Sequence, residues 1–244
     1  MTTTPTVGFI YPDHAAEDDY PLAASWLEAD FPVAHIYGTD LHAVPELLDL
    51  GSPARLAEGA RLLADRDPAA VVWACTSGSF VYGPQGAEDQ VSALAEVAGL
   101  PASSTSRAYL AALSALGTGK VAVAASYPDD VARLFVDYLA SAGVEVVSFS
   151  SAGISTAAEV GTLTPAQVTT LVTGNDHPDA EALLVPDTAM RTLAVLPELE
   201  ERLGKPVLTA NQVTIWEGLR LAGAPRYSAR LGTLFAERMA DAGR

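Results

Sequence analysis

Short apolar runs alternate with longer segments of helical periodicity along the chain. The runs are rich in Val, Ile, Leu and Ala, and turn-forming or polar residues bound each of them. Such runs are typical of parallel strands buried on both faces, and the segments between them are long enough for crossover helices. The pattern predicts an α/β fold. The predicted strands are residues 6–12, 31–38, 69–76, 100–106, 120–128, 144–151, 182–188 and 205–211.

Three of the intervening segments carry clear helix signals. In one of them, apolar residues recur at helical spacing, Asp129 and Asp130 favour the N-terminal end, and Gly143 provides a stop. The helices predicted from these signals are residues 51–66, 128–143 and 189–204.

An internal repeat relates the two parts of the chain. "VGFIYPDHA" near the start is matched by "VAVAASYPDDV" past the middle, so Tyr11 corresponds to Tyr127. Counting 64 residues forward from Tyr11 reaches Cys75, and counting 60 forward from Tyr127 reaches Asp187. Both positions end a buried-type strand and precede a threonine. We therefore expect corresponding roles for Cys75 and Asp187.

The repeat predicts two pseudo-symmetric halves, each a four-stranded parallel sheet of flavodoxin-like type. We assign residues 1–115 to the N-terminal half, joined by a C-terminal helix over 212–244, and residues 116–211 to the C-terminal half. Ligands of open parallel sheets bind beyond the carboxyl ends of the strands. Two such halves packed face to face place the active site in the cleft between them.

The composition excludes several classes of function. The 244 residues include 14 Lys and Arg against 30 Asp and Glu, a formal charge of −16 that opposes binding to nucleic acid or anionic membranes. The single cysteine allows no internal disulfide, and we see no signal peptide or membrane-spanning run, so we expect a cytoplasmic protein. Without phosphate-loop, dinucleotide or metal-ligand motifs, we expect no cofactor and no metal.

The residues at the two strand ends suggest acid–base or nucleophilic chemistry. Cys75 is either a core residue or a nucleophile, and the helix start beyond it favours a thiolate. Thr76 and Ser77 offer hydroxyl and backbone donors to a carboxylate, or they are helix caps. Asp187 is either a helix N-cap or a proton-transferring carboxyl. Tyr127 is either a phenol donor at the cleft or a packing residue.

Four stretches together resemble the aspartate/glutamate racemase superfamily, in its branch of maleate cis-trans isomerases and arylmalonate decarboxylases. They are "TVGFIYP", "VVWACTSGSFVYG", "YPDDVARLFVDYLASAGVEV" and "ELEERLGKPVLTANQVTIWEGLRLAG". The resemblance implies two pseudo-symmetric halves, no metal and no organic cofactor. It matches Cys75 to the first cysteine of the isomerases. It also matches Thr76, Ser77 and Tyr127 to donors that bind the substrate carboxylate, and Thr188 to a residue whose backbone N–H completes that cradle.

The sequence departs from the pattern of that branch at three positions. Asp187 occupies the position of the second cysteine, and Ala15 and Ala157 occupy positions where the isomerases have Asn. A second substrate carboxylate near an ionised Asp187 meets like-charge repulsion on the order of 4 kcal/mol at short range. We therefore expect either a protonated Asp187 or a substrate whose far end is not anionic.

The resemblance and the residues together predict a cofactor-independent isomerase or racemase of a small carboxylic acid. A Cys75 thiolate would act opposite Asp187 through an enolate-like or thioether intermediate. One alternative is a decarboxylase of a malonate-type acid, and another is a non-catalytic carboxylate-binding protein. A hydrolase using Cys75 with His14 or His177 is a weaker rival. His35 and His42 are assigned to packing or the surface, and self-association is possible.

Overall fold

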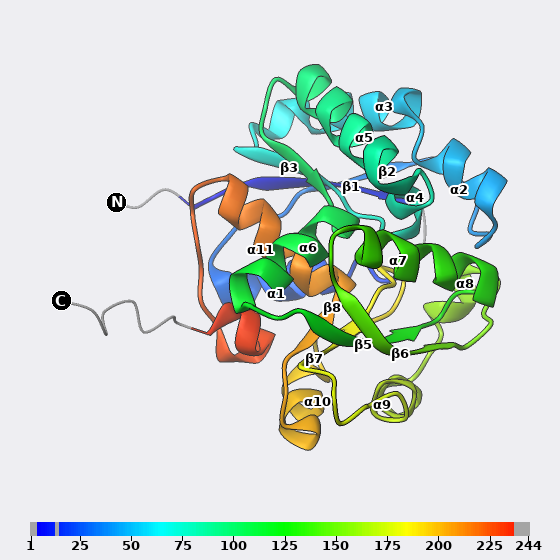
Figure 1. Ribbon diagram of the computed structural model, residues 1–244. Coiled ribbons are helices and arrows are strands. Elements are labelled where there is room, and N and C mark those ends of the chain that lie inside the picture. Colours follow the sequence, from blue (N-terminus) through cyan, green and yellow to red (C-terminus); the bar gives the residue numbers. More distant parts are fainter. Residues whose placement is uncertain (1–3, 13–14, 237–244) are drawn as a thin grey trace.

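The computed structural model describes residues 4–12 and 15–236 (Figure 1). Within these ranges the chain forms two separate sheets in which every strand pair is parallel. The first has the order β2 (Val33–Ile36), β1 (Val7–Pro12), β3 (Ala70–Trp73) and β4 (Ala102–Ser104). The second has the order β6 (Glu145–Ser151), β5 (Lys120–Ala125), β7 (Ala182–Val185) and β8 (Val207–Thr209). The equivalent orders confirm the predicted fold class and the internal repeat.

Helices connect and cover these strands (Figure 1). α11 follows the last strand of the second sheet, yet it packs against α6 and β3 of the first part of the chain. The α-helices are α1 (Asp19–Leu27), α2 (Val44–Leu50), α3 (Pro53–Leu63), α4 (Ser77–Phe80), α5 (Gly83–Ala98), α6 (Thr105–Leu116), α7 (Asp129–Ser141), α8 (Ala157–Val160), α9 (Pro165–Thr173), α10 (Leu196–Leu203) and α11 (Ala210–Leu221). The 3₁₀ helices are Ala64–Arg66, Ala229–Leu231 and Thr233–Phe235.

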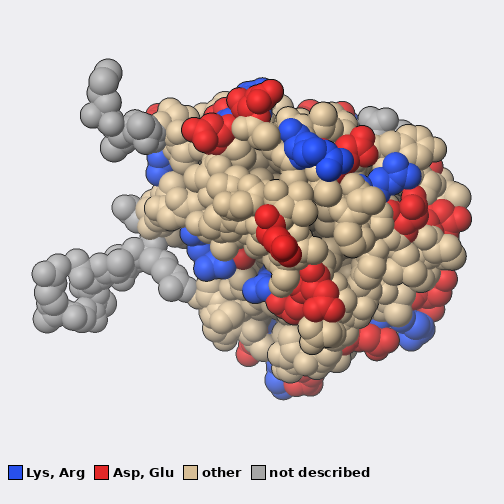
Figure 2. Space-filling view, turned by 90° about the horizontal axis from the view of Figure 1, so that it is seen from above, with Lys and Arg blue, Asp and Glu red and all other residues tan. Residues whose placement is uncertain are grey.

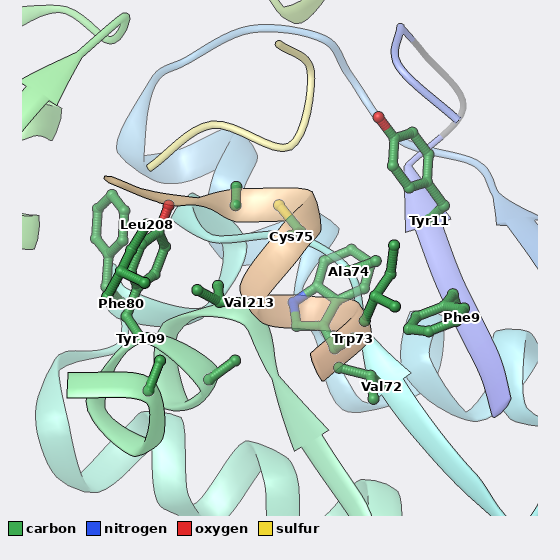
Figure 3. Close-up of a cluster of buried hydrophobic side chains, with 14 of the residues drawn as sticks. Phe9, Tyr11, Val72, Trp73, Ala74, Cys75, Phe80, Tyr109, Leu208 and Val213 are labelled. Carbon is green, nitrogen blue, oxygen red and sulfur yellow. The ribbon is translucent and has the colours of Figure 1, made fainter. Parts of the chain in front are cut away.

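Apolar side chains bury the central strands on both faces, as the uninterrupted apolar runs predict. All residues of β3 and β7 are buried, whereas the edge strand β6 is only partly covered. Figure 3 shows Val72, Trp73, Ala74 and Cys75 within one cluster of buried side chains. Cys75 therefore lies where the hydrophobic core meets the end of a central strand.

Two predicted helices are shorter than their sequence signals indicate. Residues 189–195 form turns, and α10 begins only at Leu196, with Pro197 in its first turn. The segment before α10 is held instead by the backbone N–H of Thr192, which donates to the buried Asp19 at 3.3 Å. α11 ends at Leu221 because Gly223, at φ +63°, and Pro225 do not continue a helix. Residues 237–244 of the predicted C-terminal helix lie outside the described residues.

Charged side chains are spread over the surface. On the face in Figure 2, acidic and basic side chains are interspersed. Within the described ranges, no helix has both the length and the apolar character that a membrane span requires.

Asp19, at the start of α1, is a buried carboxyl that makes stability depend on pH. Burial raises its pKa from 3.8 to about 6, against the opposing effect of hydrogen bonds from the Asn211 side chain and the Thr192 backbone. The native state therefore binds this proton more tightly than the unfolded chain does. The contribution of Asp19 to stability is accordingly lost as pH rises from about 4 to about 6.

We expect Asp19→Asn to remove this pH dependence. Relative to the unsubstituted protein, the free energy of unfolding of the variant should increase by about 2 kcal/mol between pH 4 and pH 8. Urea denaturation of both proteins at the two pH values measures this difference. The exposed control Asp137→Asn should show no comparable change. A variant whose relative stability is the same at both pH values would contradict the prediction.

Candidate active site

Cys75 and Asp187 line the same small cavity. β3 and β7 occupy equivalent places in their sheets, and each of these residues follows the carboxyl end of its strand by two positions. The cavity has a volume of about 30 Å³, enough for roughly one or two water molecules. A carboxylic acid of several heavy atoms needs more space, so the cavity must widen when such a ligand binds. Its other lining residues include Tyr11, Ser77, Thr188 and the segment 39–42.

The Cys75 thiol is buried, and burial favours its protonated form. Its side chain accepts a hydrogen bond from the Gly78 backbone N–H at 3.3 Å, and its sulfur lies 3.8 Å from Ser77 Oγ. Burial nevertheless raises the pKa of the thiol to about 12, because desolvation outweighs these hydrogen bonds and nearby Asp187 also disfavours the thiolate. Burial therefore disfavours the predicted thiolate in this conformation, and the thiolate stays a prediction. The short helix α4 does not offset the cost of removing the sulfur from water.

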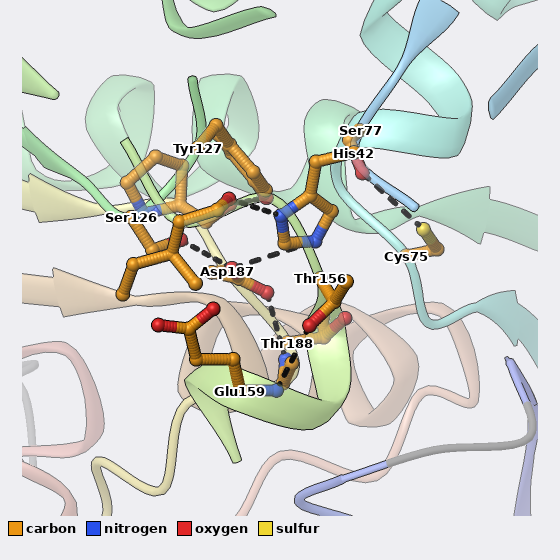
Figure 4. Close-up of polar contacts among 12 residues, drawn as sticks. His42, Cys75, Ser77, Ser126, Tyr127, Thr156, Glu159, Asp187 and Thr188 are labelled. Carbon is orange, nitrogen blue, oxygen red and sulfur yellow. Dashed lines mark hydrogen bonds and ion pairs between the residues drawn. The ribbon is translucent and has the colours of Figure 1, made fainter. Parts of the chain in front are cut away.

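Asp187 is held in place from several sides. Ser126 at the end of β5 donates a hydrogen bond to Oδ2, and the backbone N–H of Ala189 donates to Oδ1 at 2.9 Å (Figure 4). The Ala189 contact is a local side-chain cap of the kind expected for an Asp at a turn. No helix begins directly after Asp187, so the helix N-cap that the sequence offered is not formed. The carboxyl lines the cavity, where the proton-transferring role stays a prediction.

Three buried tyrosine hydroxyls fix the backbone around Asp187. Tyr109 donates a hydrogen bond to the Val185 carbonyl at 2.5 Å. Tyr11 donates to the Thr188 carbonyl at 2.7 Å, and Tyr127 donates to the Pro186 carbonyl. Tyr11 and Tyr109 come from the first part of the chain, so contacts between the two halves hold this segment. The segment is thereby preorganised.

Only some of the other predicted ligand-binding residues lie at the cavity. Ser77 and Thr188 line the cavity, whereas Thr76 and Tyr127 do not. Tyr127 is fully buried, and its single hydroxyl proton is donated to the Pro186 carbonyl, so it cannot also be donated to a substrate in this conformation. The Thr76 side-chain oxygen is buried without a hydrogen-bond partner. The carboxylate-binding roles of Thr76 and Tyr127 remain predictions that require the site to rearrange.

His42 lies at this site, although its sequence context assigned it to packing or the surface. It is 7% exposed, lines the cavity, and places Nε2 3.9 Å from Asp187 Oδ2. No motif surrounds His42 in the sequence, so only long-range packing identifies it. Of the two rival histidines, His177 has a side chain 36% exposed and does not line this cavity. His14 lies outside the described residues.

The two positions where the isomerases have Asn differ in their surroundings. Ala157 lines the cavity. The Ala15 carbonyl accepts a hydrogen bond from Arg191 at 2.7 Å. Across the described part of the chain, no group of three or more His, Cys, Asp and Glu side chains is arranged to hold a metal ion.

Comparisons with known proteins cover both halves of the chain. Residues 12–235 match the family model for arylmalonate decarboxylase. The arylmalonate decarboxylase of Bordetella bronchiseptica is 32% identical over 226 residues, covering 91% of this chain and 92% of that protein. A maleate isomerase of Geobacillus stearothermophilus is 25% identical over 180 residues, covering 71% of this chain and 72% of the isomerase.

One solved structure with a similar fold has an altered set of cysteines. It is a liganded mutant of arylmalonate decarboxylase in which cysteine replaces one glycine and serine replaces one cysteine. It has a TM-score of 0.84 and 28% identity, and the match covers 95% of this chain and 99% of that one. Together with the two relatives, it supports the resemblance identified from the sequence.

Proposed function

Since the chain belongs to the arylmalonate decarboxylase family, we propose that it is an isomerase or racemase that moves a proton at the carbon next to a carboxylate. One observation carries the proposal: a thiol whose pKa burial raises and a carboxyl group, from different halves of the chain, line the same cavity. Proton removal and proton return need one base and one acid. Cys75 and Asp187 supply this pair.

In the proposed step, Asp187 takes the proton from the carbon next to the substrate carboxylate. The electron pair of the broken C–H bond moves into the carboxylate and forms an enolate-like anion. Cys75 then gives its thiol proton to the substrate and keeps the S–H electron pair as a thiolate. One proton has entered the substrate and one has left it, and proton exchange with solvent restores both groups. Hydroxyl and backbone donors near Ser77 and Thr188 would stabilise the developing charge.

The alternative isomerisation route, through a thioether, receives less support. Addition of sulfur to a double bond requires a thiolate. A thiol with a pKa of about 12 is almost entirely protonated at neutral pH. Proton transfer from the thiol uses the protonation state that burial favours.

Decarboxylation of a malonate-type acid is the second candidate. The relative with 32% identity is a decarboxylase. The decarboxylase mutant described above, in which one cysteine was introduced and another replaced by serine, has a TM-score of 0.84. In this reaction the bond to the departing carboxyl group breaks, its electron pair forms the enolate, and Cys75 protonates it. The reaction needs the acid but gives the opposite carboxylate no necessary role.

Incubation in D₂O with three probes separates these functions. NMR would follow the isomerisation of maleate, deuterium exchange and racemisation of (S)-2-phenylpropionate, and carbon dioxide release from phenylmalonate. Deuterium exchange or racemisation that disappears in Cys75→Ala supports the proposed proton transfer. Isomerisation of maleate, which has no proton on a saturated carbon next to its carboxylates, would instead support the thioether route. Release of carbon dioxide without exchange or isomerisation supports the decarboxylase. Binding of these acids without any turnover supports the non-catalytic carboxylate-binding protein.

A further inference from the structure

His42 lies on a segment of the first half of the chain that pairs with the second half. This segment, residues 39–42, is called the strap, and all four of its residues line the cavity. Leu41 forms an antiparallel bridge with Thr156. The His42 backbone N–H donates to the Ser155 carbonyl at 2.8 Å, and the Ala157 N–H donates to the strap at Asp40, also at 2.8 Å. Backbone pairing therefore fixes the strap, and with it the imidazole, beside residues of the second half.

The contacts of the imidazole determine which nitrogen carries its proton. Nδ1 lies 3.0 Å from the Ile154 carbonyl oxygen, which can only accept a hydrogen bond. Nδ1 must therefore be protonated, and in the neutral ring the lone pair is on Nε2. That lone pair faces Asp187 Oδ2 at 3.9 Å (Figure 4). An anionic oxygen and a lone pair repel each other at this position, whereas a proton between them attracts both.

Other groups around the ring leave Asp187 as its nearest acidic partner. The ring packs edge-on against Tyr127, with centroids 4.9 Å apart, and the hydroxyl of that tyrosine donates to a backbone carbonyl. Cys75 and Asp40 line the same cavity. Among the described residues, the ion-pair contact of His42 is with Asp187, and both side chains are about 5% exposed or less. Water screens their interaction weakly at this depth.

We propose that His42 and Asp187 act as one proton-sharing pair, in which His42 is a positioning residue for Asp187. The inference rests on the proposed function. When Asp187 has taken a proton from the substrate carbon, that proton passes to Nε2, which gives an imidazolium beside a carboxylate. The net charge of the pair is zero wherever the proton lies, but imidazole is ordinarily a stronger base than a carboxylate, so the transfer returns Asp187 to its ionised form.

The protonation of the pair also affects how many negative charges a substrate can carry into the site. The sequence indicated that an ionised Asp187 repels a second substrate carboxylate. An imidazolium next to Asp187 cancels this repulsion, so the site with the shared proton admits a dicarboxylate. When the ring is unprotonated, the site favours an acid with one carboxylate.

Ring-nitrogen NMR of the histidines in the intact protein tests the pair without requiring turnover. His42→Asn identifies the His42 signals, and His177→Gln is a matched control away from the cavity. In the unsubstituted protein at pH 9, the neutral His42 ring should carry its proton on Nδ1. Asp187→Asn should shift the Nε2 resonance of His42, because the carboxylate that faces this nitrogen at 3.9 Å is lost. The ring resonances of His177 should stay the same.

Two results would overturn the pair. One is a neutral His42 ring with its proton on Nε2, which can be observed without any variant and so does not depend on whether Asp187→Asn folds. The other is an Nε2 resonance of His42 that is the same with and without the Asp187 carboxylate. Either result would leave the proposed function intact, since neither measurement uses a substrate. Absence of turnover in the D₂O experiment would leave the pair intact.

Discussion

We expect Cys75→Ala to lower kcat by about 10³-fold or more while the protein still folds. The thiol is the proton donor in both the isomerase and the decarboxylase mechanisms, and general acid catalysis typically contributes 10²- to 10⁴-fold. Alanine removes the acid but leaves the backbone of the strand end and the N–H of Gly78 in place. Steady-state kinetics on the probe that is turned over measures the loss, and circular dichroism with thermal unfolding checks the fold.

Cys75→Ser is the matched control for the shape of the site. Serine keeps a hydroxyl near the position of the sulfur, but a hydroxyl is a much weaker acid than a thiol. Both variants should therefore be almost inactive. A serine or alanine variant with more than about a tenth of the original kcat would show that Cys75 is not the acid.

Asp187→Asn should separate proton removal from decarboxylation. The amide is close in shape to the carboxyl, and it can keep the hydrogen bond from Ala189 N–H through its oxygen and bond to Ser126 through its NH₂ group. It cannot accept a proton from a carbon acid. We expect deuterium exchange or isomerisation to fall by about 10²- to 10³-fold. Release of carbon dioxide from phenylmalonate, if the protein catalyses it, should fall much less.

Ser126→Ala provides the control for the position of Asp187. It removes one hydrogen bond to the carboxyl and leaves the base itself, so its exchange rate should lie between those of the unsubstituted protein and Asp187→Asn. Equal loss of exchange and of carbon dioxide release in Asp187→Asn would argue that the carboxyl maintains the site but does not take the proton. NMR in D₂O follows both reactions in the same samples.

The sequence alone predicted the strands and their equivalent placement. Each strand is a short apolar run that a parallel sheet buries on both faces. Such a run can be recognised from its own residues, without knowing which strands it pairs with. The "YPD" repeat then paired Tyr11 with Tyr127 and Cys75 with Asp187. The equivalent orders of the two sheets confirm the repeat. Helix ends were less predictable, since the contacts of residues 189–195 with α1 override their helical periodicity.

The sequence thus determined which fold forms and which strand ends hold the thiol and the carboxyl. Tertiary structure alone raises the pKa of the thiol, because that pKa depends on how much water the elements around Cys75 exclude. It also decided that the Tyr127 hydroxyl is occupied by a backbone carbonyl. Finally, it brought His42 to Asp187 by pairing residues 39–42 with residues 154–157, a contact between distant segments that carries no local sequence signal.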